Sequence, residues 1–399
     1  MSRCLWMFSM LLGGLVISQA AEPKRFIQDR FAIGLWVDPP PVEKYYADLA
    51  AANFSVVIGG FCAVTTDAIR QQLELCKKYA LRAVIARAGQ PAGQLPKSPE
   101  VWGYQLQDEP GAANFPALRI AVDELRRARP GALAYINLFP NQANPKQLGT
   151  KSYDEYVRRF VEEVDPEVLS MDHYPYFRPD LDGRAGYCAS LDVMRKYALL
   201  KNIPFWNFFN SMPFGAHVDP TEAQLRWQIY TSLAYGAKGV LYFCYWTPRG
   251  AEFPKGGGII SAEGIKTRHY EQARRLNRVI KNLGPVLMKL TSTSVVHGDD
   301  SADSKTLLKG GALKSLSKGD WLIGFFKHAD GRRAVLLNNY QHAYTAWPTV
   351  EFASSLAQVR EVDRETGAEI PVPDDSPDMK GLQISLDAGE GRLFLLPAH

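Results

Sequence analysis

Along its first 280 or so residues the chain alternates short apolar runs with longer amphipathic stretches. Each run is rich in β-branched and aromatic residues and ends at turn residues, and each is followed by a stretch of helical periodicity. We expect eight strands, at Phe31–Val37, Phe54–Gly59, Arg82–Ile85, Trp102–Gln107, Ala134–Phe139, Val168–Asp172, Pro204–Phe209 and Gly239–Tyr245. Eight strand–helix units within about 250 residues predict a (β/α)₈ TIM barrel.

The main alternative is an open, doubly wound sheet. Such a sheet usually carries a glycine-rich phosphate loop after its first strand, whereas here Trp36, Asp38 and three prolines follow the first strand. The pattern therefore favours the barrel. Further along, short alternating segments are separated by Gly, Asp, Pro and Asn turns, which predicts a small β-sandwich. We expect a barrel over residues 21–288 and a C-terminal β-sandwich domain over residues 289–399.

The N-terminus has the features of an export signal. Arg3 precedes an apolar core over Leu5–Ile17, and the small-residue site Ser18-Gln19-Ala20 follows it. We expect residues 1–20 to be a signal peptide and the mature protein to be exported, either periplasmic or secreted. The core is short for a membrane span, and no later stretch reaches the roughly 18 apolar residues that a spanning helix needs. An uncleaved anchor is the alternative; otherwise no membrane contact is expected.

Charge and cysteine content narrow the class of ligand. The formal net charge is +4, and it falls to +3 when Arg3 leaves with the signal, which is too small to indicate nucleic acid as a partner. The mature chain would keep Cys62, Cys76, Cys188 and Cys244, whose wide spacing matches no zinc motif, and the seven histidines are scattered. No metal and no cofactor are expected. Disulfide pairing and oligomeric state stay open.

The segment WGYQLQDEP carries the strongest chemical signal. It ends in two adjacent carboxylates, Asp108 and Glu109, and is stopped by Pro110. In a TIM barrel the active site is built at the C-terminal ends of the strands. The other candidate residues at such positions are Trp36, Asp38, Asn137, Asp172, His173, Tyr174, Trp206, Asn207, Asn210, Tyr245 and Trp246.

This mixture of aromatic, amide and carboxylate side chains is typical of a carbohydrate site. Aromatic faces stack on sugar rings, and Asn, Asp and His supply directional hydrogen bonds to hydroxyl groups. Hydrolysis of a glycosidic bond needs a protonated carboxyl and a second group at the oxocarbenium-like centre. We assign the acid to Glu109, because the adjacent Asp108 disfavours its ionisation. Asp108 itself acts either in catalysis or in orienting its neighbour.

Four segments, DEP, SMDHYPY, PFWNFFNS and EAQLRWQIYTSLAYGAKGVLYFCYWTP, resemble the TIM-barrel glycoside hydrolase superfamily of clan A type, including its beta-galactosidase-like families. The resemblance covers roughly residues 31–283. It implies an acid/base Glu after Asn at the end of strand four, and a nucleophilic Glu at the end of strand seven. Glu109 matches the first position, but Asp108 replaces the Asn, and strand seven offers Asn207 and Asn210.

Three mechanisms therefore stay open. One is the two-glutamate mechanism of the clan, which lacks its strand-seven carboxylate. The Asp108–Glu109 pair is also similar to substrate-assisted hexosaminidases, in which the Asp orients an N-acetyl group that acts as the nucleophile. A third arrangement pairs Glu109 with Asp172 on strand six.

The sequence thus predicts an exported glycoside hydrolase that cleaves oligo- or polysaccharides, with Glu109 as general acid or acid/base. The alternative is a non-catalytic carbohydrate-binding protein on a degenerate glycosidase barrel, which the absent strand-seven carboxylate favours. An esterase is not favoured, because the chain has no GxSxG motif.

Overall fold

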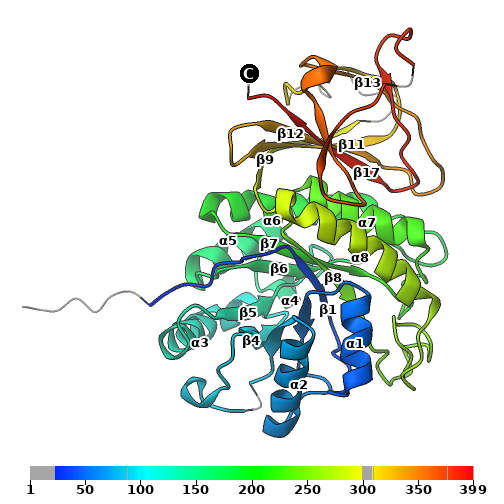
Figure 1. The fold of residues 1–399 in the computed structure, drawn as a ribbon. Coiled ribbons are helices and arrows are strands. Elements are labelled where there is room, and N and C mark those ends of the chain that lie inside the picture. The colour runs from blue at the N-terminus through cyan, green and yellow to red at the C-terminus, as the bar shows by residue number, and fades with distance from the viewer. Residues whose placement is uncertain (1–22, 88, 299–307, 309, 375, 399) are drawn as a thin grey trace, which may run out of the picture.

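The computed structural model describes residues 23–398, apart from residues 88, 299–307, 309 and 375. The predicted signal peptide, residues 1–20, lies outside the described residues. A barrel forms the first part of the chain, and an antiparallel β-domain follows it (Figure 1).

Eight parallel strands form the barrel. They are β1 (Ala32–Leu35), β2 (Val56–Ile58), β3 (Arg82–Ile85), β4 (Val101–Asp108), β5 (Leu133–Asn137), β6 (Leu169–Asp172), β7 (Phe205–Asn210) and β8 (Gly239–Phe243). Their order in the sheet is β5-β4-β3-β2-β1-β8-β7-β6. The two end strands meet through a parallel bridge between Leu138 and Met171, where the Leu138 N–H donates to the Ser170 carbonyl at 2.8 Å. The predicted (β/α)₈ barrel is confirmed, and the open doubly wound sheet is excluded.

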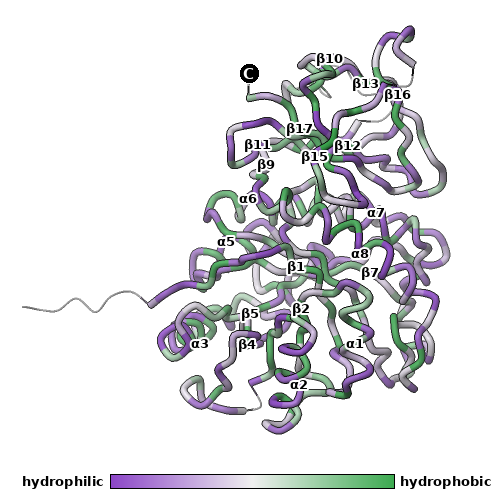
Figure 2. The backbone as a smooth tube through the Cα atoms, viewed as in Figure 1, coloured by the Kyte–Doolittle hydropathy of each residue, from purple (hydrophilic) through white to green (hydrophobic). Residues whose placement is uncertain are grey.

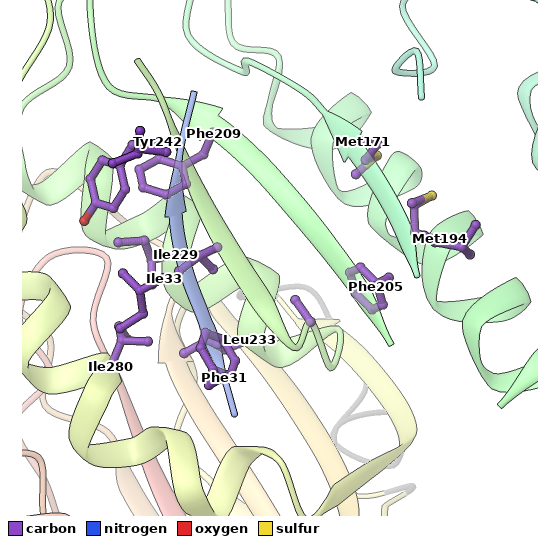
Figure 3. Close-up of a cluster of buried hydrophobic side chains, with 14 of the residues drawn as sticks. Phe31, Ile33, Met171, Met194, Phe205, Phe209, Ile229, Leu233, Tyr242 and Ile280 are labelled. Carbon is purple, nitrogen blue, oxygen red and sulfur yellow. The ribbon is translucent and has the colours of Figure 1, made fainter. Parts of the chain in front are cut away.

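Helices surround the barrel. They are α1 (Glu43–Ala51), α2 (Thr66–Lys78), α3 (Phe115–Ala128), α4 (Pro145–Leu148), α5 (Tyr153–Glu163), α6 (Arg184–Lys201), α7 (Glu222–Ala234) and α8 (Arg268–Leu287). Alternate strand residues face them. Figure 3 shows this layer, in which Ile33 of β1 and Phe31, just before it, lie near Leu233 of α7 and Ile280 of α8.

The opposite face of each strand fills the barrel interior. Large aromatic side chains occupy it: Trp206 lies between Trp102 and Tyr135, with ring centroids 6.0 and 5.9 Å away. The Trp206 indole N–H donates to the side-chain oxygen of Gln28, just before β1, at 2.9 Å. The interior is therefore a packed core, as in other TIM barrels.

The C-terminal domain consists of two antiparallel sheets. The larger has the order β15-β14-β17-β12-β11-β9, and the smaller β10-β13-β16. The strands are β9 (Leu290–Gly298), β10 (Leu313–Leu316), β11 (Trp321–His328), β12 (Arg333–Asn339), β13 (Thr349–Phe352), β14 (Arg360–Val362), β15 (Glu369–Pro371), β16 (Leu382–Gln383) and β17 (Gly391–Leu396). Trp321, Ile323 and Phe325 of β11 join the core that the two sheets share. This confirms the predicted β-sandwich.

The larger sheet also lies directly on the barrel. Alternate residues of β11, Leu322 and Phe326, join the hydrophobic core that surrounds the barrel helices, and the Asn338 side chain on β12 donates to the carbonyl of Tyr230 on α7 at 2.9 Å. Figure 1 shows α7 between the barrel strands and this sheet. In Figure 2 the strands are mainly hydrophobic, while hydrophilic and hydrophobic positions alternate along the outer helices. None of the described helices has the length and apolar character needed to cross a membrane.

Candidate active site

A cavity of about 210 Å³ opens at the C-terminal ends of the barrel strands. It is lined by Trp36, Asp108, Glu109, Asn137, Asp172, Tyr174, Phe208 and Phe243. The first six of these were singled out from the sequence. The volume lies below the roughly 300–1,000 Å³ of sites for drug-sized ligands, so the cavity suits a small group such as one sugar ring.

The end of β4 is bent so that two consecutive carboxylates reach this cavity. A β-bulge between Gln105 and Gln107 shifts its register against β5, and Glu109 has a φ of 46°. A non-glycine residue in this left-handed region carries strain of about 1–3 kcal/mol, which is commonly found at functional sites. Two contacts hold the turn: the Glu109 N–H donates to the Asn137 carbonyl at 2.8 Å, and the Tyr156 hydroxyl donates to the Pro110 carbonyl at 2.7 Å.

Asn137 connects the carboxylates of two different strands. Its side-chain nitrogen donates to Asp108 Oδ1 at 3.1 Å and to Asp172 Oδ1 at 2.8 Å. Its side-chain oxygen accepts from the Ser170 hydroxyl at 3.0 Å, so both ends of the amide are hydrogen-bonded. Since Asn137 ends β5 and Asp172 ends β6, these bonds also link the two strands between which the barrel closes.

The cavity holds a coupled carboxyl pair. Glu109 and Asp172 share a side-chain hydrogen bond, which requires one proton between them. Burial first, and the charge of Asp108 second, raise the pKa of Glu109 to about 7. Burial, followed by the charges of Glu109 and Asp108, raises the pKa of Asp172 well above its usual range. The pair therefore holds a proton near neutral pH.

The remaining cavity walls are aromatic. The Tyr174 side chain interacts with Asp172, and its ring centroid lies 5.2 Å from that of Phe243. On the other side, Trp36 packs edge-to-face on Phe208 at 5.4 Å. Sequence reasoning missed Phe208 and Phe243. Alternation along β7 would have found Phe208, because it lies two residues after the inward Trp206.

Two predicted sugar-binding residues face the helices instead. The Asn207 side chain donates to the Tyr187 hydroxyl at 2.6 Å and to the Ser232 hydroxyl at 3.0 Å. His173 is fully buried, and its Nδ1 lies 3.0 Å from the Ser190 hydroxyl; burial lowers its pKa to about 3, so it is neutral. Strand alternation is the reason: these side chains point away from the cavity that their neighbours line, which corrects the expectation.

Four further predicted sugar-binding residues also do not line the cavity. Trp206 belongs to the packed barrel interior described above. Tyr245 is fully buried, and its ring packs 5.5 Å from that of Phe54. Asn210 donates to the Val218 carbonyl and accepts from the Met212 N–H, so it holds the loop after β7. Trp246 packs against Tyr45, with ring centroids 4.8 Å apart, and does not line the cavity.

Asp38 is also no cavity residue. It is fully buried, and its carboxylate accepts hydrogen bonds from the backbone N–H groups of Phe61, Cys62 and Ala63 at 3.0 to 3.2 Å. The charge of Asp38 is therefore directed at the β2–α2 loop, which corrects the predicted contact with a ligand.

The described residues offer no group of three or more His, Cys, Asp or Glu side chains arranged to hold a metal ion. Within the same part of the chain, Cys62, Cys76, Cys188 and Cys244 are free thiols. The cavity itself is lined by carboxyl groups, one amide and aromatic rings.

Comparison with known proteins shows the fold. No protein-family model and no curated protein matches the chain. Among solved structures, it is similar to a GH42 beta-galactosidase from G. stearothermophilus, with 9% identity, a TM-score of 0.59 and coverage of 92% of this chain and 98% of that one. It is also similar to a beta-galactosidase from Bacillus circulans sp. alkalophilus, with 10% identity, a TM-score of 0.58 and coverage of 94% and 99%.

A third similar structure is a beta-galactosidase from the haloarchaeon Halorubrum lacusprofundi, with 14% identity and a TM-score of 0.50. The match covers 64% of this chain and 59% of that one, so the chain spans about three fifths of that enzyme's length. The chain thus shares its fold, a TIM barrel followed by a β-domain, with these beta-galactosidases.

Proposed function

We propose that this protein is a glycoside hydrolase that cleaves oligo- or polysaccharides, with Glu109 as general acid/base and Asp172 as the second carboxylate. The observation that carries the proposal is the hydrogen-bonded Glu109–Asp172 pair at the C-terminal ends of β4 and β6. The similarity in fold to beta-galactosidases supports the same class of reaction.

The cavity supplies what glycoside cleavage requires. A carboxyl group with a pKa of about 7 is protonated in a large share of molecules at neutral pH, and it can give its proton to the leaving glycosidic oxygen. The aromatic walls suit the C–H faces of a sugar ring. The buried surroundings strengthen the interaction between the carboxylates and the positive charge that develops on the ring.

The contact between the two carboxyls favours a retaining mechanism. Inverting enzymes separate them by about 6.5–9.5 Å to admit a water molecule, whereas retaining enzymes hold them about 5–5.5 Å apart. The direct interaction between Glu109 and Asp172 holds the two carboxyls closer than the inverting separation. In the proposed first step the proton of the pair lies on Glu109, which protonates the departing oxygen as the Asp172 carboxylate bonds to the anomeric carbon. In the second, Glu109 removes a proton from water, which displaces Asp172 as the sugar leaves.

One observation favours a second mechanism in the same site. Asp108 reaches the cavity beside Glu109, and β7 contributes the apolar Phe208 where a nucleophilic carboxylate would stand. In a substrate-assisted reaction Asp108 would orient an N-acetyl group of the substrate, and that group would attack the anomeric carbon. Asp172 would then serve only to tune the pKa of Glu109.

A panel of aryl glycosides, including galactosides, glucosides and N-acetylhexosaminides, tests the proposal. Wild type is compared with Glu109→Gln, Asp172→Asn and Asp108→Asn. Glu263→Gln is the matched control, because its carboxylate lies in the loop after β8 and accepts a hydrogen bond from Ser261. Loss of turnover in the Glu109 and Asp172 variants alone supports the retaining pair. Turnover confined to N-acetylhexosaminides and lost in Asp108→Asn supports substrate assistance.

Sugar binding without turnover of any glycoside would instead identify a carbohydrate-binding protein on a degenerate barrel. Activity that survives Glu109→Gln undiminished would reject the assignment of the acid.

We also propose that the protein is exported. Arg3, the apolar core over Leu5–Ile17 and the Ser18-Gln19-Ala20 site support this from the sequence alone. N-terminal sequencing of the protein from an expressing bacterium tests it. Export predicts a mature N-terminus near Ala21 in the extracytoplasmic fraction, and an intact Met1 in the cytoplasm would refute it.

A further inference from the structure

We infer that Phe61, held in place by Asp38, forms a second sugar-binding subsite at the mouth of the cavity, so that the preferred substrate is at least a disaccharide. The inference rests on the proposed function for the identity of the ligand. It assigns a role both to an exposed aromatic residue and to a buried charge that the catalytic site leaves unused.

Phe61 continues the aromatic wall of the cavity outward. The ring of Trp36, which lines the cavity, packs edge-to-face on Phe208 inside it, and packs on Phe61 with centroids 5.3 Å apart. Phe61 is 44% exposed, and among the described residues of the barrel it is the only exposed aromatic side chain. Trp36 therefore connects the aromatic lining of the cavity with the exposed ring of Phe61.

The size of the cavity explains why a second subsite is needed. At about 210 Å³ it has room for one sugar ring. Further rings of an oligosaccharide must lie beyond the mouth, where an exposed aromatic face can stack against their C–H surface. Phe61 lies one ring contact from the cavity wall and offers such a surface.

The loop that carries Phe61 is built to fix this side chain. Three consecutive N–H groups, of Phe61, Cys62 and Ala63, donate to the Asp38 carboxylate. Gln72 of α2 donates to the same carboxylate at 3.0 Å. A buried charge is costly unless several donors satisfy it. Here the donors come mainly from the loop backbone, so the carboxylate fixes the conformation of this short loop.

Both ends of the loop are also specified. Gly60 has a φ of 114°, and a Cβ atom at this position would lie 2.6 Å from the side-chain oxygen of Gln105, so only glycine fits. At the other end, the Thr65 side chain accepts from the Ala68 N–H and caps α2.

The backbone just before Asp38 adopts a strained conformation that fits the positioning of the Phe61 loop. Val37, a β-branched residue, has a φ of 61°, in a region that such residues rarely adopt. This turn lets Trp36 face the cavity while Asp38 faces the β2–α2 loop. Strain of this kind persists only where the surroundings fix it. The strained residue Val37 stands between Trp36, which lines the cavity, and Asp38, which positions the loop.

Calorimetric titration tests the subsite in the Glu109→Gln background, which prevents turnover. The probes are mono-, di- and trisaccharides of three β-1,4-linked series, built from galactose, glucose and N-acetylglucosamine. The quantity compared is the preference for the trisaccharide over the monosaccharide. We expect Phe61→Ala to lower this preference about tenfold, and Phe61→Trp to preserve it.

Val64→Ala is the matched control, because Val64 is an equally exposed apolar residue of the same loop, at 48%. It should keep the preference of the parent. Asp38→Asn tests the positioning role: its amide would turn hydrogens toward backbone donors and release the loop. It should lose the same preference as Phe61→Ala, and a melting curve verifies that the variant is folded.

An undiminished trisaccharide preference in Phe61→Ala would overturn the subsite, as would the absence of binding by every saccharide in the three series. Hydrolysis of the same saccharides by the wild type separates the two proposals. If the wild type hydrolyses none of these saccharides but its preference for binding the trisaccharide depends on Phe61, the proposed function alone is refuted. If the wild type hydrolyses the saccharides but the preference for binding the trisaccharide is unchanged in Phe61→Ala, the subsite alone is refuted.

Discussion

The ends of β7 and of the β4–β6 group carry similar polar residues with opposite roles. At the end of β7, the side chains of Asn207 and Asn210 each donate to fixed protein partners in the helix layer and the following loop. At the ends of β4 and β6, the carboxyls of Glu109 and Asp172 interact inside the cavity, and the pKa of each is raised above its ordinary value. The side-chain N–H groups of Asn207 and Asn210 are bonded within the protein, whereas the carboxyls of Glu109 and Asp172 line the cavity.

This contrast shows that the identity of a residue at a strand end does not decide its role. What decides it is the side of the strand that the residue occupies and whether its hydrogen bonds are already satisfied. A buried amide with protein partners contributes to stability, while burial first, and the charge of Asp108 second, raise the pKa of Glu109 and create an acid.

The largest expected effect comes from removing the acid. Glu109→Gln should lower kcat/KM for glycosides with poor leaving groups by about 10²–10⁴-fold, because the departing oxygen no longer receives a proton. The loss should be much smaller for 2,4-dinitrophenyl glycosides, whose leaving group needs no protonation. Steady-state kinetics with a series of leaving groups measures this. An equal loss across the series would show that Glu109 does not act as the acid.

A pair of amide variants tests the contrast directly. Asn207→Ala should cost about 1–3 kcal/mol of unfolding free energy, because the Tyr187 and Ser232 hydroxyls lose a buried donor, and it should leave kcat/KM within about twofold. Asn137→Ala should reduce kcat/KM by at least about tenfold, because Asp108 and Asp172 both lose the group that orients them. Urea denaturation and kinetics on the same preparations measure both. The reverse pattern would contradict the division of roles.

The acid should also carry a cost in stability that depends on pH. The folded-state pKa of Glu109, about 7, lies above its ordinary value of 4.5, so the folded protein binds the proton more tightly and loses stability as pH rises between these values. Glu109→Gln removes this loss. The full shift corresponds to about 3 kcal/mol, and partial exposure of the carboxyl reduces it, so the variant should be more stable than wild type by about 1–2 kcal/mol at pH 8 and equal to it at pH 4. A stability difference that is the same at both pH values would contradict this linkage.

The smallest effect concerns the alkaline limb of the pH profile. As a general acid, Glu109 must be protonated, so kcat/KM should fall above about pH 7. Burial is the first cause of its raised pKa and the charge of Asp108 the second. Asp108→Asn removes only the second cause, so the limb should move to lower pH by less than about one unit. A limb that stays in place would mean that another group is titrating.

The fold was predictable because its signals are local. Each strand is a short apolar run between turn residues. Eight such runs that alternate with helical stretches are compatible with few folds other than a barrel. The convergence of strand ends in a barrel also placed Glu109, Asn137 and Asp172 near one another, although they are far apart in sequence.

What the sequence did not reveal is the direction of each side chain. His173 lies between two cavity residues, Asp172 and Tyr174, yet points outward, as period-two alternation requires. The bulge in β4 and the left-handed conformation of Glu109 break that alternation, and no residue pattern signals either of them. Polar identity drew attention to Asn207, whereas the apolar Phe208 beside it lines the cavity.

The position of α7 has a consequence for how the protein could be divided. Its residues Trp227, Tyr230 and Leu233 are buried, with the barrel on one side and the larger C-terminal sheet on the other. Truncation of the chain after Leu287 would expose Trp227 and Tyr230 to solvent. The resulting apolar surface would promote aggregation. The C-terminal β-domain is thus an outer wall of the barrel, and an exchange of this domain between related proteins would have to carry α7 with it.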